Sequence, residues 1–300
     1  MRRTPRWRHA LSALAVLTMS TTVATLVGPQ VAQAAPTPIW VVADLVRCRT
    51  GVSNSPGARD VVAAIDARIV MPGDLVSPDG ATAEFTGCFD PLWGRFKERT
   101  RPTPGNHEYK TDRGAAYYDY FGGIAPYYAW TARGWRMYSL NSMCGYHGGC
   151  GVGSPMYRWL EADLRAHDRP CEAAYWHHPR WSQGAQGNIE RMAPLYALLD
   201  RYDVELLFVG NENGVYQRYP ALGRRGRPTA RGVTEFVVST GGVTDGAGVV
   251  TPNLPAPVVR EDGTLGALLL SLAPASWQAD FVAEAGSSFT DHAAGRCFEP

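Results

Sequence analysis

Five apolar runs of the sequence end in side chains that could bind a metal ion or transfer a proton. The residues that follow these runs are Asp44, Asp74, the pair Asn106-His107, the pair His177-His178, and the cluster Asn211, Glu212 and Asn213. Carboxylate and amide oxygens bind hard divalent metals, and imidazole adds affinity for zinc or iron. Taken singly, each residue could instead cap a helix or hold a turn. Five clusters at equivalent positions predict one shared polar site.

The apolar runs alternate with amphipathic segments, which predicts a layered α/β fold. We expect buried strands at residues 39–43, 68–71, 173–176, 205–209 and 235–239. We expect helices at residues 57–67, 155–167 and 192–199, and a C-terminal hairpin at residues 267–272 and 277–282. Ligands of α/β sheets bind at the carboxyl ends of the strands, so this fold would bring the polar residues together. Glycines at 73, 105 and 210 would let the backbone turn sharply there.

The first 34 residues have the pattern of a secretory signal peptide. A basic start with four arginines precedes the apolar stretch 11–27, and Ala32-Gln33-Ala34 is a small-x-small cleavage site. A membrane anchor is the alternative, and we disfavour it because the apolar stretch is short and interrupted. We therefore expect a secreted protein without a membrane anchor after cleavage, in which residues 35–300 form a single domain.

The charge of the chain argues against partners that are held by charge alone. The formal net charge of the 300 residues is +1, so no basic field exists to hold nucleic acid or an anionic membrane. We expect a small-molecule substrate, phosphorylated or otherwise, and no nucleic acid.

All six cysteines lie in the predicted mature chain, and an even number in an exported protein predicts disulfides. Cys144 and Cys150 bracket a Gly-rich loop, and we favour a bond between them. Among the many ways to pair the rest, Cys48 with Cys88 and Cys171 with Cys297 would complete the set, while one or two free thiols remain an alternative. The sequence contains no Cys-x-x-Cys pair, which disfavours a thiolate zinc site.

The order of these motifs resembles that of the calcineurin-like metallophosphoesterases, most closely their exported, purple-acid-phosphatase-like branch. The resemblance is carried by GNHEY at 105–109, SLNS at 139–142, GSPMYRWLEADLRAH at 153–167, YWHHPRWSQG at 175–184 and FVVSTGG at 236–242. It covers nearly the whole predicted mature chain. It implies two central β-sheets flanked by helices, with a two-metal site at the strand ends that hydrolyses phosphate esters.

The resemblance also implies a role for each polar residue. Asp44 would bind the first metal, Asp74 would bridge both metals, and the second metal would take Asn106 and His177. The implied metals are iron, zinc or manganese. The remaining implied roles are His107 as the acid that protonates the leaving oxygen or as a phosphate clamp, and His178 and Arg180 as residues that support the ligands or face the substrate.

Three positions depart from the family pattern. Ser77 stands where this branch has a metal-binding tyrosine, and Asn211 and Asn213 stand where the family motif Gly-His-x-His provides two imidazoles. A shift of register would not restore an imidazole, because no histidine occurs between His178 and His292.

The departures weaken the two implied metal positions unequally. The first would be empty or labile, whereas the second could hold one ion through Asp74, Asn106 and His177. Glu212 could add a carboxylate, although we favour a solvated loop position for it. His147, between Cys144 and Cys150, could face the cleft, although we favour a surface position.

Three functions are compatible with this pattern. The first, which we favour, is a secreted phosphoesterase with a weakened, single-metal site. The second is an inactive pseudophosphatase that has kept the fold for binding. The third is a repurposed catalyst in which His107 and His177 perform acid–base chemistry without metals.

Overall fold

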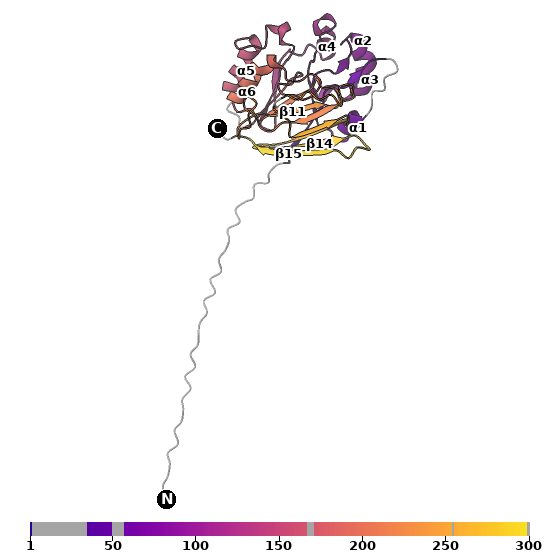
Figure 1. The fold of residues 1–300 in the computed structure, drawn as a ribbon. Coiled ribbons are helices and arrows are strands. Elements are labelled where there is room, and N and C mark those ends of the chain that lie inside the picture. The colour runs from indigo at the N-terminus through magenta and orange to yellow at the C-terminus, as the bar shows by residue number, and fades with distance from the viewer. Residues whose placement is uncertain (2–34, 50–56, 167–170, 254, 299–300) are drawn as a thin grey trace. The chain divides into compact units, whose positions relative to one another are not determined.

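Two central β-sheets, built from short apolar strands, form the framework of the structure (Figure 1). The structure is a computed structural model that describes Met1 and residues 35–49, 57–166, 171–253 and 255–298. The six-stranded sheet has the order β15 (Thr290–Arg296), β14 (Ser276–Ala283), β13 (Gly266–Ala273), β1 (Thr37–Val41), β3 (Arg68–Pro72), β5 (Thr100–Thr103). The seven-stranded sheet has the order β12 (Val259–Asp262), β10 (Val215–Arg218), β11 (Thr234–Ser239), β9 (Leu206–Val209), β8 (Glu172–Tyr175), β7 (Trp135–Ser139), β6 (Tyr128–Ala132). A small parallel pair joins β2 (Val46–Arg47) to β4 (Val76–Ser77).

The alternation of side chains along β1 shows how the layers are held together. Ile39 and Val41 pack into the core between the two sheets, whereas Trp40 and Val42 belong to the core on the opposite, outer face. On that face lie α1 (Gly57–Ala63), α2 (Thr82–Glu84), α3 (Asp90–Trp93) and α4 (Ala115–Tyr120). The outer face of the seven-stranded sheet is covered by α5 (Pro155–Ala166) and α6 (Ala193–Arg201). The result is four layers, with helices outside and sheets inside.

The expected α/β class with two sheets flanked by helices is confirmed. The five expected strands correspond to β1, β3, β8, β9 and β11, and the expected hairpin to β13 and β14. The helix expected at 57–67 is shorter than predicted and ends at Ala63, because the chain turns there to enter β3. The helix expected from residue 155 ends at Ala166 within the described residues, and His167 lies outside them.

Three disulfides join the six cysteines in the pairing that we favoured from the sequence. They connect Cys48 to Cys88, Cys144 to Cys150 and Cys171 to Cys297. Among the described residues, no helix is both long and apolar enough to cross a membrane. The described residues from Ala35 onward belong to one compact unit. The predicted signal peptide, apart from Met1, lies outside the described residues and stays a prediction.

Candidate metal centre

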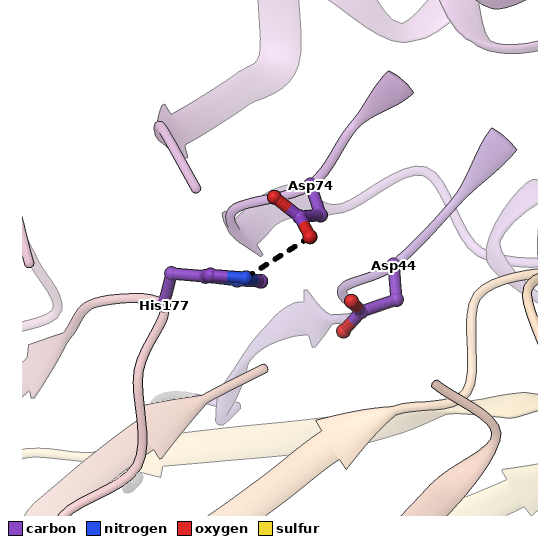
Figure 2. Close-up of side chains that lie close together, drawn as sticks. All are labelled: Asp44, Asp74 and His177. Carbon is purple, nitrogen blue, oxygen red and sulfur yellow. Dashed lines mark ion pairs between the residues drawn. The ribbon is translucent and has the colours of Figure 1, made fainter. Parts of the chain in front are cut away.

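Four of the predicted ligands follow strands at the carboxyl edges of both sheets. Asp44 follows β1, Asp74 follows β3 and Asn106 follows β5, all in the six-stranded sheet, whereas His177 follows β8 of the seven-stranded sheet. Figure 2 shows Asp44, Asp74 and His177 pointing toward one another from these segments. The candidate site therefore lies where the two sheets meet, as the strand-end pattern predicts.

The backbone at this edge adopts a conformation that few side chains tolerate. Asp44, Asp74 and Asn211 have φ angles of 59°, 50° and 75°, in the left-handed region where Asp and Asn are the least unfavourable residues after Gly. Each of them follows its strand within three residues, so the chain turns abruptly as the strand ends. Strained backbone of this kind is typical of functional sites.

At two of the three glycines predicted here, the lack of a side chain lets another segment approach closely, and the backbone is not left-handed. Gly73 has a φ of +82°, as expected. In contrast, Gly105 and Gly210 are not in the left-handed region, but a Cβ at Gly105 would lie 2.2 Å from Asp74 Oδ1, and one at Gly210 would lie 2.8 Å from the Pro72 carbonyl oxygen. The chain turns directly after both positions, but these two glycines do not adopt the left-handed conformation, and the reason for glycine there is space.

His177 is oriented so that one ring nitrogen faces the carboxylates. Its Nδ1 donates to the carbonyl oxygen of Pro72 at 2.9 Å, and the ring is fully buried. With the proton on Nδ1, the lone pair of Nε2 faces Asp74 Oδ2 at 3.1 Å. This is how a metal-binding histidine is commonly held, with its second nitrogen fixed by a backbone carbonyl.

The ionisable groups at the site differ in their preferred charge. Burial raises the pKa of Asp44 to about 7, with the charge of His177 opposing this rise and that of Asp74 adding to it. Burial acts on Asp74 in the same direction, but His177 and His107 outweigh it and lower the pKa of Asp74 to about 2. Burial disfavours the cationic imidazole, yet Asp74 and Asp44 raise the pKa of His177 to about 9. The cluster thus favours one positive charge at Nε2, which a proton or a metal ion can supply.

Unpartnered buried atoms test whether a metal ion fits. Asp44 Oδ1, Asn106 Oδ1 and His177 Nε2 are buried and have no hydrogen-bond partner. The candidate ligand atoms of Asp44, Asp74 and His177 lie within 4.8 Å of one another. Buried polar atoms are rarely left unpaired, and here they are of the types that bind zinc, iron or manganese. Oxygens of Asp44 and Asp74 and Nε2 of His177 lie close enough to bind a single ion, and the unpartnered Asn106 Oδ1 is a candidate for a fourth ligand.

Two of the three positions that depart from the family pattern form side-chain hydrogen bonds away from the candidate ligands, and the third contacts the site through its backbone. Ser77 Oγ donates to the carbonyl oxygen of Val46 at 3.3 Å. The amide nitrogen of Asn213 donates to Asp245 Oδ1 at 2.8 Å, and Asp245 also forms an ion pair with Arg47. Asn211 contacts the site through its backbone, because its N–H donates to Asp44 Oδ2 at 3.0 Å.

Glu212 is buried, so the solvated position that we favoured for it was wrong. Its Oε1 accepts from Ser182 Oγ at 2.5 Å, and its Oε2 accepts from the N–H of Gln186 at 3.0 Å. Its own N–H donates to Ser239 Oγ. These bonds hold the carboxylate as a structural link between loops.

His107 lies beside the candidate ligands. Its backbone N–H donates to Asp74 Oδ1 at 3.0 Å, and its Nδ1 lies 2.5 Å from the carbonyl oxygen of Pro78. A contact this short with a carbonyl requires a proton on Nδ1, so Nδ1 cannot also accept from Lys110 Nζ, which lies 3.0 Å away. The second nitrogen, Nε2, is 3.7 Å from Asp74 Oδ2 and is the one left to exchange a proton.

His178 and Arg180 lie behind the cluster. Nδ1 of His178 is 2.7 Å from Ser142 Oγ, and burial together with the charge of His177 lowers its pKa well below the usual range. The Arg180 guanidinium pairs with Glu190 at 3.0 Å and stacks over the Trp181 ring at 3.7 Å. Substrate contact by Arg180, or proton transfer by His178, stays a prediction.

One buried residue of the GNHE motif was given no role from the sequence. Glu108 Oε2 accepts the N–H groups of Asp74 at 3.0 Å and Gly105 at 2.7 Å, and its Oε1 accepts that of Val76 at 3.1 Å. The side chain thereby ties the turn before Asn106 to the loop that carries Asp74. The motif itself was the available signal, since a glutamate within it stands directly after two site residues.

A family model described as calcineurin-like phosphoesterase matches residues 37–212. Three solved structures share the fold. PPD1, a purple acid phosphatase from yellow lupin (Lupinus luteus) seeds, has a TM-score of 0.67 and 15% identity over 87% of this chain and 54% of its own. GAP50, the anchor in the inner membrane complex of Plasmodium, has a TM-score of 0.61 and 10% identity over 86% of this chain and 88% of its own. PhoD has a TM-score of 0.60 and 8% identity over 89% of this chain and 70% of its own.

At these identities the likeness extends to the fold alone. The chain spans about half the length of the lupin protein, at 54%. Comparison with curated proteins gives no significant match.

Proposed function

The chain belongs to the calcineurin-like phosphoesterase family, and on that premise we propose that it is a secreted hydrolase of phosphate esters that works with a single metal ion. The observation that carries the proposal is the set of buried, unpartnered atoms Asp44 Oδ1, Asn106 Oδ1 and His177 Nε2 beside Asp74. Iron, zinc or manganese would suit this donor set.

Four side chains would hold the ion, and each is prepared for that task. Asp74 is ionised, and His177 presents Nε2 because Pro72 fixes its other nitrogen. Asp44 and Asn106 each offer a free oxygen. When bound there, a divalent metal supplies positive charge to a phosphate oxygen and favours attack at phosphorus.

His107 is the residue that we propose as the acid. Pro78 holds its Nδ1, which leaves Nε2 on the side of Asp74, and the side chain is partly exposed at 18%. A proton on Nε2 can therefore reach the leaving oxygen of a substrate placed at the ligands. The carboxylate of Asp74 also holds the main chain of His107 by accepting its backbone N–H.

Export is supported by the pattern of the first 34 residues and by the three disulfides. We further propose that the substrate is a small phosphorylated molecule. Cleavage after residue 34 removes four arginines and no acidic residue, so the formal net charge falls from +1 to −3 and gives no general attraction to a polyanion.

A binding protein without hydrolysis is the second candidate. It is favoured by Ser77 and Asn213, which stand where the family has a tyrosine and a histidine and whose side chains donate hydrogen bonds to Val46 and Asp245. GAP50, which has a similar structure, serves as an anchor in the inner membrane complex of Plasmodium.

Turnover of p-nitrophenyl phosphate and bis-p-nitrophenyl phosphate by the disulfide-bonded mature chain separates these candidates. We expect turnover with added Mn²⁺, Zn²⁺ or Fe²⁺, loss on chelation, and a fall of more than about 100-fold in Asp74→Asn. Asp66→Asn, a substitution of an exposed carboxylate paired with Arg99, is the matched control. Metal uptake without turnover would support the binding protein, and turnover that resists chelators would indicate metal-free acid–base catalysis.

A further inference from the structure

Four polar side chains, which the proposed function does not use, meet beside the turn that follows β5. They are Tyr109 in the turn, Tyr118 in α4, Asn141 after β7, and His147 in the short helix η4 (Cys144–His147). The helix η4 belongs to the loop that the disulfide between Cys144 and Cys150 closes. The side chain of Tyr109 is thus the point where three other segments reach the turn.

The direction of each hydrogen bond follows from Asn141. Its Oδ1 accepts the N–H of Met143 at 2.9 Å, so the other end of the amide is the NH₂ group. This group donates to Tyr109 Oη at 2.7 Å and to Tyr118 Oη at 3.3 Å. Both hydroxyl oxygens therefore already accept a bond from Asn141.

Matching the two tyrosine hydroxyl protons to the available acceptors then shows which ring nitrogen of His147 carries the proton. Tyr109 Oη lies 2.7 Å from Tyr118 Oη and 2.7 Å from His147 Nε2. Nε2 also lies 3.3 Å from Tyr118 Oη, but the contact with Tyr109 is the shorter one. If Nε2 is an acceptor, Tyr109 therefore donates to it and Tyr118 donates to Tyr109, so every proton has a partner. If Nε2 carries a proton, Tyr109 must donate to Tyr118, and the hydroxyl of Tyr118 has no acceptor left in the cluster. The closed network therefore requires a neutral imidazole with its proton on Nδ1.

The surroundings of His147 agree with that assignment. Burial and the charge of Arg113 lower its pKa below the ordinary value. The groups that face the ring are Tyr109, Tyr118 and Arg113, with Tyr146 stacked on Tyr109 at 4.6 Å.

Tyr109 links this network to the candidate site. Its backbone N–H donates to the carbonyl oxygen of Asn106 at 3.3 Å, and the next N–H donates to that of His107 at 3.2 Å. The side chain of Glu108 joins the same turn to the loop of Asp74, because it accepts the N–H of Gly105 as well as those of Asp74 and Val76. The orientation of the turn thus depends on two consecutive side chains, one of which is held by His147.

We propose that His147 is a positioning residue. Its neutral imidazole accepts the hydroxyl proton of Tyr109 and thereby holds in place the turn that carries Asn106 and His107. When the imidazole is protonated, it no longer accepts this hydrogen bond, and the turn is released. Only its consequence for turnover rests on the proposed function, because the order of the turn can be measured without catalysis.

Amide hydrogen exchange of residues 105–110 tests this in the mature, disulfide-bonded chain at pH 7.5 and pH 5.0, corrected for intrinsic exchange rates. In the wild type we expect protection to fall about fivefold at the lower pH, which is the effect of one lost hydrogen bond. His147→Gln keeps an acceptor that does not titrate, so its protection should depend on pH less than that of the wild type, while Asp44, whose pKa is about 7, titrates equally in both. His147→Leu should be poorly protected at both pH values, and His292→Gln, a change at an exposed histidine of β15, should behave like the wild type.

Equal protection of wild type and His147→Leu at pH 7.5 would overturn the proposal, and so would the same pH dependence in wild type and His147→Gln. If His147→Leu does not fold, Tyr109→Phe removes the donor instead, and its turn should lose protection at pH 7.5. If the chain hydrolyses p-nitrophenyl phosphate, kcat of the wild type should fall between pH 7.5 and pH 5.0 as the protection of the turn falls. At pH 5.0, His147→Gln should have a higher kcat than the wild type. Absence of turnover in the wild type and in all variants would contradict the proposed function. The role of His147 would then be judged from the hydrogen-exchange result alone.

Discussion

Asp44 and Asp74 are both buried at the same sheet edge, yet their pKa values are about 7 and about 2. The difference arises because Asp74 contacts His177 and receives the N–H of His107, whereas Asp44 receives the N–H of Asn211 and leaves Oδ1 unpartnered. Asp74 is thus a permanent anion, and Asp44 gains most from a nearby cation. This asymmetry suits one ion held between the two carboxylates.

Gly105 packs so closely against Asp74 that a larger residue at this position should disturb metal binding. A Cβ there would lie 2.2 Å from Asp74 Oδ1, so Gly105→Ala must displace either the carboxylate or the turn. We expect metal affinity, measured by isothermal titration with Mn²⁺ or Zn²⁺, to fall by about tenfold or more. Gly87→Ala is the control, because a Cβ at Gly87 meets no atom within 4 Å. Unchanged affinity in Gly105→Ala would mean that Asp74 is not a ligand.

A second prediction concerns the lost imidazoles. The double variant Asn211→His/Asn213→His supplies both and frees Asp245 from Asn213. We expect the metal content by elemental analysis to rise from one ion to two per chain, because histidine binds zinc and iron more strongly than an amide does. Ser77 is left unchanged, since it is only 4% exposed and a tyrosine would overpack its position. A metal content that does not rise would show that other parts of the first position are also lost.

The loops at the sheet edge are joined by carboxylates that the chain buries for that purpose. Glu108 accepts three backbone N–H groups, whereas a glutamine would offer one oxygen and leave at least one of them unpaired. Glu108→Gln should therefore lower the free energy of unfolding by about 1–3 kcal/mol, measured by urea denaturation. It should also weaken metal binding, while Glu98→Gln at an exposed position should do neither. Full stability in Glu108→Gln would remove the role assigned to these bonds.

The strands could be predicted from the sequence because their apolar runs are short, buried on both faces and followed by polar residues. Runs of this kind predicted the first and last residues of β3 and β8 to within one position. The partly exposed strands β6, β12 and β15 have no comparable run, and their pairing depends on neighbours that are distant in the chain. The limits of α1 were missed for a similar reason, since β3 begins shortly after Ala63.

The clustering of Asp44, Asp74 and His177 was predictable, because each of them follows the end of a strand at the edge where the two sheets meet. That Asn106 is a further ligand stays a prediction. Contacts between side chains from separate segments were not predictable. A glutamate such as Glu212 in a Gly/Asn-rich stretch looks solvated until Ser182 and the N–H of Gln186 are seen to reach it. His147 was expected at the surface, yet it is half-buried against Tyr109, which no local pattern reveals.

Several buried carboxyls with raised pKa values make the stability of the molecule depend on pH, and Glu172 is one of them. Tyr138 Oη lies 3.0 Å from Asp163 and 2.9 Å from Glu172, but a single hydroxyl proton cannot serve both carboxyl groups. Arg136 binds Asp163 through two bonds and keeps it ionised, so Glu172 is the group that carries a proton. Burial raises the pKa of Glu172 from 4.5 to about 8.

The raised pKa of Glu172 should make the free energy of unfolding depend on pH. A carboxyl whose pKa is raised in the folded state contributes stability that is fully present below pH 4.5 and is lost as the pH rises to about 8. Glu172→Gln keeps a donor toward Tyr138 at every pH. Its free energy of unfolding in urea should match the wild type at pH 5 and exceed it by about 1–3 kcal/mol at pH 9. An equal decline between these pH values in variant and wild type would contradict this assignment.

The proposed activity depends on one ion bound between the two sheets by Asp44, Asp74, Asn106 and His177. The most direct test is the metal-to-protein ratio of the mature chain, measured by elemental analysis after dialysis, beside that of Asp74→Asn. We expect about one ion of iron, zinc or manganese per chain in the wild type and none in the variant. A ratio of two in the wild type, or a chain that binds no metal at all, would contradict the single-metal site.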